Sequence, residues 1–220
     1  MSDINDFVIE YGVLKKYNGS EQIVKIPDSV SSIGDFAFSG CTGLTSVKIP
    51  NSVTSIGKGV FWDCKGLTSI EIASSVSSIG RDAFRGCTGL KTLSISQDNE
   101  FFASVNGAIY SKDRKKLIKY VCLSNATHFS IPDGVTTIAT WAFDGCIGLT
   151  SIEIPDSVTY IGEEAFLGCE GLTSIEIPNS VSSIGGHAFS FCNDNLVIIT
   201  SAGSYAEEYA KKNGIKVKLV

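Results

Sequence analysis

The feature that most constrains this chain of 220 residues is a repeat of 23 residues that returns six times. Isoleucine and phenylalanine each recur at a fixed place in it. The isoleucine positions are Ile33, Ile56, Ile79, Ile138, Ile161 and Ile184. The phenylalanine positions are Phe38, Phe61, Phe84, Phe143, Phe166 and Phe189. A fixed period between about 20 and 50 residues is typical of a solenoid, in which each repeat forms one coil stacked on the next.

Each repeat has two parts with different patterns. Leu44, Val47 and Ile49 alternate with polar residues, and this period of two predicts a strand with one face inward. A proline follows the strand in most repeats and ends its hydrogen bonding, because proline has no N–H. The segment from Gly34 to Gly40 encloses five residues between glycines, which predicts one tight helical or 3-10 turn. Parallel strands of neighbouring coils are expected about 4.8 Å apart.

The repeat phrase SIGxxAFxGCxGLTSIxIPxSV resembles the BspA-like, or treponemal-type, class of leucine-rich repeat over nearly the whole chain. It departs from the general leucine-rich pattern, since serine follows the strand where asparagine or cysteine is expected and the cysteine precedes the leucine. The resemblance implies a right-handed α/β solenoid. A parallel β-sheet would line its concave face, and short helical or 3-10 turns would lie opposite.

The two ends and the middle of the chain depart from the repeat. At the N-terminus, two segments with apolar residues, 7–11 and 13–17, flank Gly12, and Asn18-Gly19 is a turn signal after them, which together predict a β-hairpin cap. Ser204 and Glu207 form a capping-box pattern, which predicts a helix to Lys212 and a strand after it. Alternating residues around polar turns predict a hairpin insertion in the middle. We therefore expect one repeat domain over residues 1–220, with an N-terminal cap at 1–22, repeats at 23–96, the insertion at 97–128, repeats at 129–201 and a C-terminal cap at 202–220.

Six of the seven cysteines follow the repeat, and only Cys122 is out of phase. Disulfides and metal binding are two interpretations. Seven is an odd number, equivalent side chains on stacked coils point in parallel, and no C-x-x-C motif is present. We favour a third interpretation, a ladder of buried thiols that pack as small apolar groups.

Composition and motifs argue against several classes of function. The net charge is −5 and no Lys or Arg stripe runs along the chain, so we expect no nucleic-acid partner. No apolar run reaches the roughly 18 residues of a membrane span. No nucleotide-binding glycine motif and no acid–base or metal constellation is found, so we expect no enzyme activity and no cofactor. One basic cluster, Arg114 to Lys116 with Lys112 and Lys119, is interpreted as solvated or as a site for an anionic partner.

The repeats offer surfaces instead. If Val47 and Ile49 face inward, the residues between them face outward on the sheet. The outward residues form a candidate binding face: Lys25, Ser46, Lys48, Ser69, Glu71, Thr92, Ser151, Glu153, Ser174 and Glu176. A rival surface on the turn side holds four aromatic residues, namely Phe36, Trp62, Trp141 and Tyr160. Because aromatic anchors dominate strong interfaces, we expect a tight partner to use the second surface and weaker contacts to use the first.

These observations predict a non-catalytic protein-interaction scaffold, resembling cell-surface adhesion or host-interaction modules of bacteria or protozoa. Its partner would be a protein of the extracellular matrix or host, and the chain would be a monomer. An alternative is an intracellular interaction domain of a larger protein. A leader preceding this chain would favour the cell surface or secretion, and free thiols would favour the cytoplasm.

Overall fold

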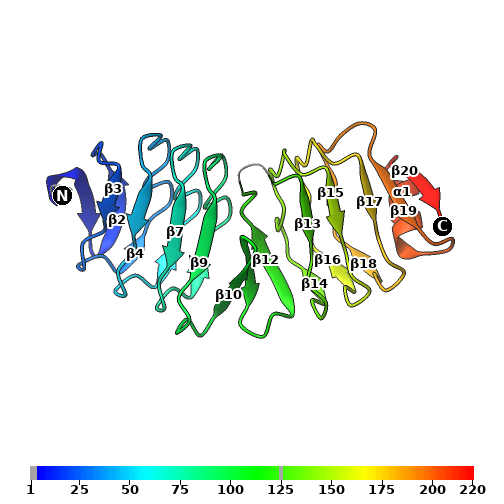
Figure 1. Cartoon of the computed structure of the whole chain (residues 1–220), viewed down its shortest axis with the longest axis horizontal. Coiled ribbons are helices and arrows are strands. Elements are labelled where there is room, and N and C mark those ends of the chain that lie inside the picture. Colours follow the sequence, from blue (N-terminus) through cyan, green and yellow to red (C-terminus); the bar gives the residue numbers. More distant parts are fainter. Residues whose placement is uncertain (1–3, 124–125) are drawn as a thin grey trace. The chain divides into compact units, whose positions relative to one another are not determined.

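The computed structural model describes residues 4–123 and 126–220 as a β-solenoid (Figure 1). It has two compact units, Met1–Ala108 and Ile109–Val220. The predicted insertion at 97–128 contains the division between the units, and two of its residues lie outside the described ranges. The expectation of one repeat domain stays a prediction.

The first unit contains two ladders of strands, which are parallel except for the first pair of the second ladder. The longer strands form the sheet β3-β5-β7-β9, and the second sheet has the order β1-β2-β4-β6-β8. The longer strands are β3 (Ile23–Lys25), β5 (Ser46–Lys48), β7 (Ser69–Ile72) and β9 (Thr92–Ile95). The second sheet comprises β1 (Phe7–Glu10), β2 (Val13–Tyr17), β4 (Ser32–Ile33), β6 (Ser55–Ile56) and β8 (Ser78–Ile79). A 3-10 helix at Ile4–Asp6 precedes β1, and β10 (Phe102–Val105) follows β9.

The second unit also has two ladders, but its longer strands divide into one sheet of two strands and one of three. Its longer strands are β13 (His128–Ser130), β15 (Ser151–Glu153), β17 (Ser174–Glu176), β19 (Val197–Thr200) and β20 (Lys216–Leu219). Its other ladder runs in the order β11-β12-β14-β16-β18. These strands are β11 (Ala108–Ser111), β12 (Lys116–Tyr120), β14 (Thr137–Ile138), β16 (Tyr160–Ile161) and β18 (Ser183–Ile184).

The 23-residue period is the register of the sheets. Val47 pairs with Ile70, and Ile70 with Leu93, so each strand residue stands beside its equivalent one coil later. The same shift relates Ile33 to Ile56 in the second ladder. Because the apolar residues fall in register, they build a continuous core between the two ladders, and Val47, Ile33 and Ile56 are all buried.

The rings of the repeated phenylalanines stack through the centre of each unit. Phe38, Phe61 and Phe84 have ring centroids 5.4 and 5.7 Å apart in the first unit. In the second unit, Phe143, Phe166 and Phe189 stack at 5.0 Å in both steps. Rings at these distances add to the stability that burial alone supplies.

The predicted helical turns are not found, and in this respect the α/β assignment was wrong. Among the described residues, the segments between the strands form hydrogen-bonded turns, and the one α-helix is α1 (Tyr205–Lys212). The N–H groups of Phe36, Phe38 and Gly40 donate to carbonyls of the next coil. Those of Ala37 and Ser39 donate three residues back. A backbone that alternates its donors between two coils cannot continue as a helix.

Two left-handed residues in every coil shape these turns. Phe36 has a φ of 57° and Gly40 a φ of 75°, and the equivalent positions of the other coils are also positive. The first place is glycine in only one coil. Asp82, Trp141, Glu164 and His187 occupy it elsewhere. Side chains in this region strain the backbone, so the stacking of coils must hold them there.

A hairpin opens each unit. In the first, β1 and β2 are antiparallel, and Leu14 of β2 pairs with Ile33. In the second, β11 and β12 are neighbours joined by four residues, and Leu117 of β12 pairs with Ile138. A connection this short joins antiparallel strands, since parallel ones need a long crossover.

The C-terminal helix forms where the sequence predicts it. The Ser204 hydroxyl accepts a hydrogen bond from the Glu207 N–H, and Glu207 accepts one from the Gly203 N–H. Two amide donors of the first turn region are thereby satisfied. The following strand, β20, pairs in parallel with β19.

The interpretation of all seven cysteines as free thiols was wrong for two of them. Cys122 and Cys146 form a disulfide, with Cα atoms 5.3 Å apart. Cys122 lies just beyond the hairpin, outside the ladder, so its side chain can meet Cys146 instead of running parallel to it. The five other cysteines are free.

The free thiols carry hydrogen bonds as well as packing. Cys64 donates to the carbonyl of Phe38 at 3.1 Å, and Cys87 donates to that of Phe61 at 3.0 Å. Cys169 and Cys192 make the same bond in the second unit. Burial raises the pKa of Cys87 to about 12, so this thiol stays neutral at physiological pH.

Candidate functional site

The outer face of the sheet β3-β5-β7-β9 presents the side chains that the alternation predicts. Val47 is buried, whereas its neighbour Ser46 is half-buried and its neighbour Lys48 is exposed. Ser69 and Glu71 repeat this pattern in β7, and Thr92 follows in β9. Lys25 of β3 is also exposed and lies 3.8 Å from Asp28.

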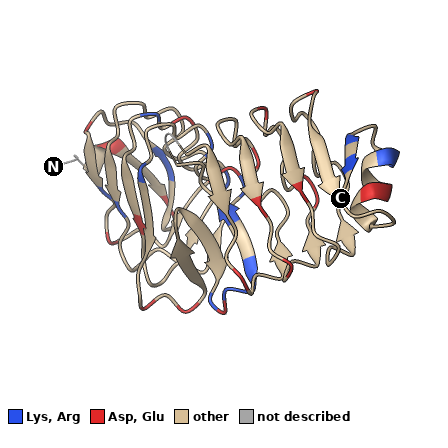
Figure 2. Ribbon diagram, turned by 45° about the vertical axis from the view of Figure 1, so that its right-hand side comes forward, with Lys and Arg blue, Asp and Glu red and all other residues tan. Residues whose placement is uncertain are grey.

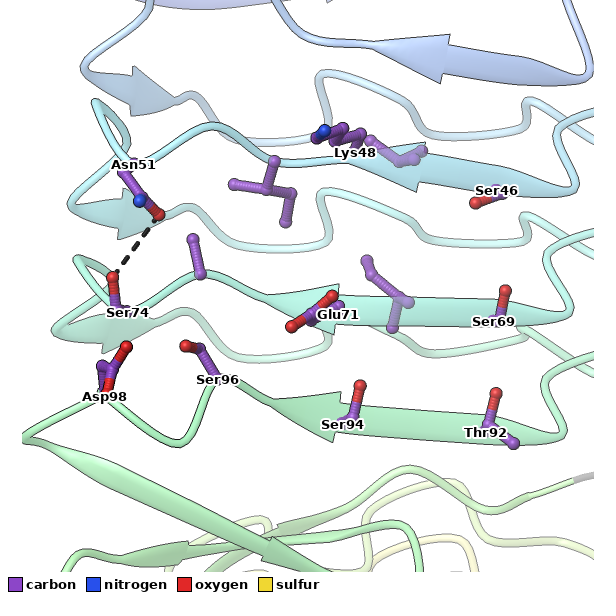
Figure 3. A pocket seen from close by; sticks show the side chains of 14 residues that line it. Ser46, Lys48, Asn51, Ser69, Glu71, Ser74, Thr92, Ser94, Ser96 and Asp98 are labelled. Carbon is purple, nitrogen blue, oxygen red and sulfur yellow. Dashed lines mark hydrogen bonds between the residues drawn. The ribbon is translucent and has the colours of Figure 1, made fainter.

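This face is hollowed over β5, β7 and β9 (Figure 3). The hollow has a volume of about 690 Å³. Its polar lining forms three columns across the coils, and the side chains of equivalent strand residues stand side by side in Figure 3. The columns are Ser46, Ser69 and Thr92; Lys48, Glu71 and Ser94; and Asn51, Ser74, Ser96 and Asp98.

Opposite charges face this hollow without neutralising each other. Lys48 pairs with Glu71 in the strand register, and Asp98 lines the same hollow. Among the described residues, none of these three side chains makes an ion pair. One ammonium and two carboxylates are therefore available to a ligand, together with hydroxyl groups that both donate and accept.

Sequence reasoning missed the loop column of this hollow. Asn51 and Ser74 follow the strands and are joined by a hydrogen bond of 3.4 Å, while Asp98 belongs to a turn after β9. Asn51 and Ser74 are 23 residues apart, so the period could have indicated them. Asp98 lies where the repeat breaks, and only the structure brings it to the hollow.

The outer face of the second unit has a different chemistry. Ser151 and Glu153 lie on β15, which pairs with β13, the strand of His128. Ser174 and Glu176 lie on β17, which contacts β15 in the next coil. The His128 ring contacts Ser151 Oγ through Nδ1 at 2.9 Å and Glu153 through Nε2 at 3.8 Å. His128 is exposed, and these two side chains contact its ring.

Two of the four predicted surface aromatics belong to the first unit. Phe36 is 43% exposed and lies 6.1 Å from the half-buried ring of Trp62. Lys58 lies over the first ring and Arg85 over the second. Both cations were missed, because positions 22 or 23 residues apart become neighbours only in stacked coils.

The other two aromatics belong to the second unit. Trp141 is half-buried, and its indole N–H donates to the Glu164 carboxylate at 2.8 Å. Tyr160 is 41% exposed in β16. The Trp62 indole similarly donates to Asp63 at 3.1 Å. The polar edges of both tryptophans are thus already engaged within the chain.

The sequence and fold of this chain can now be compared with those of known proteins. A family model described as the BspA type leucine-rich repeat region matches residues 13–111 and 116–216 with six copies. The chain belongs to this family. As a BspA-type repeat protein it is placed among proteins that are generally non-catalytic, and the family suggests a protein-interaction scaffold.

Solved structures of bacterial leucine-rich repeat proteins resemble this BspA-type chain. One from Eubacterium ventriosum is 24% identical with a TM-score of 0.58, over 87% of this chain and 66% of that one. A leucine-rich cell surface protein from Faecalibacterium prausnitzii is 32% identical with a TM-score of 0.51, over 86% and 62%. One from Bacteroides ovatus is 26% identical with a TM-score of 0.52, over 90% and 60%.

This chain therefore spans between 60% and 66% of the length of those three structures. No match is found among curated proteins. Neither helix within residues 4–123 and 126–220 has the length and apolarity of a membrane span.

Proposed function

We propose that this chain is a non-catalytic, protein-binding module of a cell-surface protein, and that its first unit recognises the partner through the hollow over β5, β7 and β9. The observation that carries this proposal is the set of unpaired charges, Lys48, Glu71 and Asp98, ringed by hydroxyl groups. A charged group that has no partner within the protein loses no internal contact when a ligand pairs with it. Such pairs contribute most where the partner excludes water.

The candidate face on the second unit, Ser151, Glu153, Ser174 and Glu176, would supply further contacts of acidic character. The aromatic surfaces have a smaller role in this proposal than the sequence predicts. The tryptophans are half-buried and their N–H groups are satisfied, so a partner gains fewer hydrogen bonds there than at the hollow.

The cell-surface role is supported by two observations. The Faecalibacterium prausnitzii relative, 32% identical, carries the description of a leucine-rich cell surface protein. The disulfide between Cys122 and Cys146 is of the kind that persists in oxidising surroundings. We propose that the partner is a host or extracellular-matrix protein and that the module acts as a monomer.

The test is a binding screen of the whole chain against purified extracellular-matrix proteins and glycans by biolayer interferometry. For a protein that binds, the variant Lys48→Ala/Glu71→Ala/Asp98→Ala should lose at least tenfold in affinity. The matched control, Lys65→Ala/Glu10→Ala/Glu21→Ala, removes the same charges from exposed sites elsewhere on the unit and should stay within twofold.

A third variant, Trp62→Ala/Trp141→Ala, decides between the two surfaces. If it loses binding while the hollow variant does not, the turn side is the site and this assignment is wrong. A chain that binds no protein of the panel contradicts the matrix-binding role.

Five free cysteines favour a second candidate, an interaction domain inside the cell. Protease treatment of intact cells separates the two. Digestion of the protein on intact cells supports the surface role, whereas protection until lysis supports the intracellular one.

A further inference from the structure

The turn between β11 and β12 concentrates positive charge on an otherwise acidic chain. Lys112, Arg114, Lys115 and Lys116 lie within five consecutive residues, and all four are exposed. The whole chain carries a net charge of −5. Figure 2 shows blue gathered along this turn and the start of β12. Like charges repel one another, so a cluster of this kind is most stable when an anion lies against it.

The turn is built to hold these cations in place. The Asp113 carboxylate accepts hydrogen bonds from the Ser111 hydroxyl at 2.6 Å and from the Lys115 N–H at 3.0 Å. The Ser111 hydroxyl in turn accepts one from the Lys116 N–H. Arg114 lies between them with a φ of 57°. The one acidic residue of the turn thus fastens its backbone.

The base of the turn is fixed to the neighbouring coil. The Lys115 carbonyl accepts hydrogen bonds from the N–H groups of Thr136 and Thr137 at 2.8 and 3.2 Å, and Lys116 pairs with Thr137 in the parallel ladder. Lys119 is separate, since its ammonium donates to the Trp141 carbonyl at 2.9 Å. Because the backbone of the turn is held at both sides, binding has to order only the side chains, and this lowers the entropic cost of association.

The equivalent hairpin of the first unit lacks this feature. There β1 and β2 are joined by Tyr11 and Gly12 alone, with no basic residue in the turn. Its two cations, Lys15 and Lys16, lie on the strand and are exposed. A hairpin can therefore open a unit without a basic turn, and stacking the coils does not require the four cations.

We propose that the β11–β12 turn is a binding site for sulfated glycans. Lysine binds sulfate as a point charge, and the Arg114 guanidinium can donate two parallel hydrogen bonds to one sulfate group. Residues 111–116 contain no aromatic or aliphatic anchor. Membrane-surface segments use such anchors to enter the lipid, and single-stranded nucleic-acid sites use them to stack bases. A flexible chain of sulfated sugars needs only cations at short spacing.

The experiment measures retention of the whole chain on immobilised heparin and dextran sulfate, with neutral dextran as the blank. At 50 mM NaCl the wild-type chain should bind both sulfated polymers and not the blank, and 500 mM NaCl should release it, because salt screens exposed charges. The variant Lys112→Gln/Arg114→Gln/Lys115→Gln/Lys116→Gln should bind at least tenfold more weakly.

The matched control removes four exposed lysines of the first unit, as Lys15→Gln/Lys16→Gln/Lys65→Gln/Lys91→Gln. It has the same net charge as the turn variant and should keep binding within twofold. Lys112→Arg/Lys115→Arg/Lys116→Arg should also keep it, which separates lost charge from a damaged turn.

Three results would overturn the proposal. These are equal loss in the control and turn variants, no preference of the wild-type chain for sulfated over neutral dextran, and tighter binding to phosphatidylserine vesicles than to heparin. The protein-binding hollow lies on the other unit, so its variant should retain heparin binding whether or not that proposal holds.

Discussion

The two units begin alike, although their sequences before the first coil differ. Leu14 and Leu117 take the same place in the ladder, paired with Ile33 and Ile138. Three residues later, Tyr17 and Tyr120 lay their rings against the first phenylalanine of each stack, at 5.2 and 5.7 Å. The comparison teaches that a hairpin strand can replace the first coil, provided that its leucine and tyrosine keep the register.

The units differ two residues beyond these tyrosines. The second unit has Cys122 there and the first has Gly19, while the first ladder cysteine is Cys146 in one and Cys41 in the other. Cys122 and Cys146 are bonded, and Cys41 is free. One residue outside the repeat therefore decides whether the first coil is covalently tied to its hairpin.

The largest effect is expected from removing a ring of the phenylalanine stack, which both units share. Phe61→Ala and Phe166→Ala each remove a buried ring from the middle of a stack and should each lower the free energy of unfolding by about 3–5 kcal/mol. Urea denaturation measures this, and hydrogen exchange locates the loss in the unit that carries the change. Similar values in both units would support their equivalence, and a loss under about 1 kcal/mol in either would contradict it.

The next largest effect is expected from removing the disulfide, which only the second unit has among the described residues. The Cys122–Cys146 bond closes a loop with a sequence separation of 24, so Cys122→Ser should lower the free energy of unfolding by about 2–4 kcal/mol. Dithiothreitol should destabilise the second unit of the wild-type chain by a similar amount. Hydrogen exchange in the first unit, which has no disulfide among its described residues, should not change with the reductant. Equal effects in both units would break the comparison.

A smaller effect concerns the reactivity of the thiols. Denatured, unreduced protein should show five free thiols, and seven after reduction. In the native chain at pH 8, iodoacetamide should modify the half-buried Cys41 and Cys192 before the buried Cys64, Cys87 and Cys169. Mass spectrometry of the labelled peptides measures the order. Rapid labelling of Cys87 would contradict the buried, hydrogen-bonded ladder.

The same thiols predict a dependence of stability on pH. Burial raises the pKa of Cys87 from its ordinary value near 9 to about 12, so the folded chain holds this proton more tightly than the unfolded one. Its contribution to stability is complete below about pH 9 and is lost as the pH rises toward 12. Cys87→Ala should weaken this alkaline loss, and an unchanged profile between pH 8 and 11 would argue against it.

The smallest expected effect tests whether the hairpin of the first unit can form the disulfide that the second unit has. Gly19→Cys gives the first unit the residue that its counterpart has, but a Cβ there would collide with the Tyr17 hydroxyl and lie 2.8 Å from Asp6. We expect no bond to Cys41, and therefore six free thiols in denatured, unreduced protein. A count of four would mean that the hairpin of the first unit adapts to the disulfide.

Much of the fold follows from the sequence because its pattern is local and repeated. The alternation of Ser46, Val47 and Lys48 fixed which side chains face outward, and the capping pair Ser204 and Glu207 fixed the start of α1. Of the residues that line the hollow, Ser46, Lys48, Ser69, Glu71 and Thr92 were predicted to face outward, whereas the hollow itself comes from the structure. The turns were misassigned as helical, because some of their N–H groups donate to a carbonyl three residues back and others donate to a carbonyl of the next coil. The sequence pattern does not distinguish these two acceptors.

The sequence by itself determined the solenoid, its period, its core residues and its outward face, since each depends on spacing along the chain. Only the tertiary structure decided which side chains from different coils meet. It placed Asp98 in the lining of the hollow together with Glu71, and it joined Cys122 to Cys146. It also gave each turn residues with positive φ in place of a helical turn. The physical reason is that these contacts depend on how the coils stack. A residue outside the repeat, such as Asp98 or Cys122, has no equivalent residue one period away, so the spacing along the chain does not predict which residue it contacts.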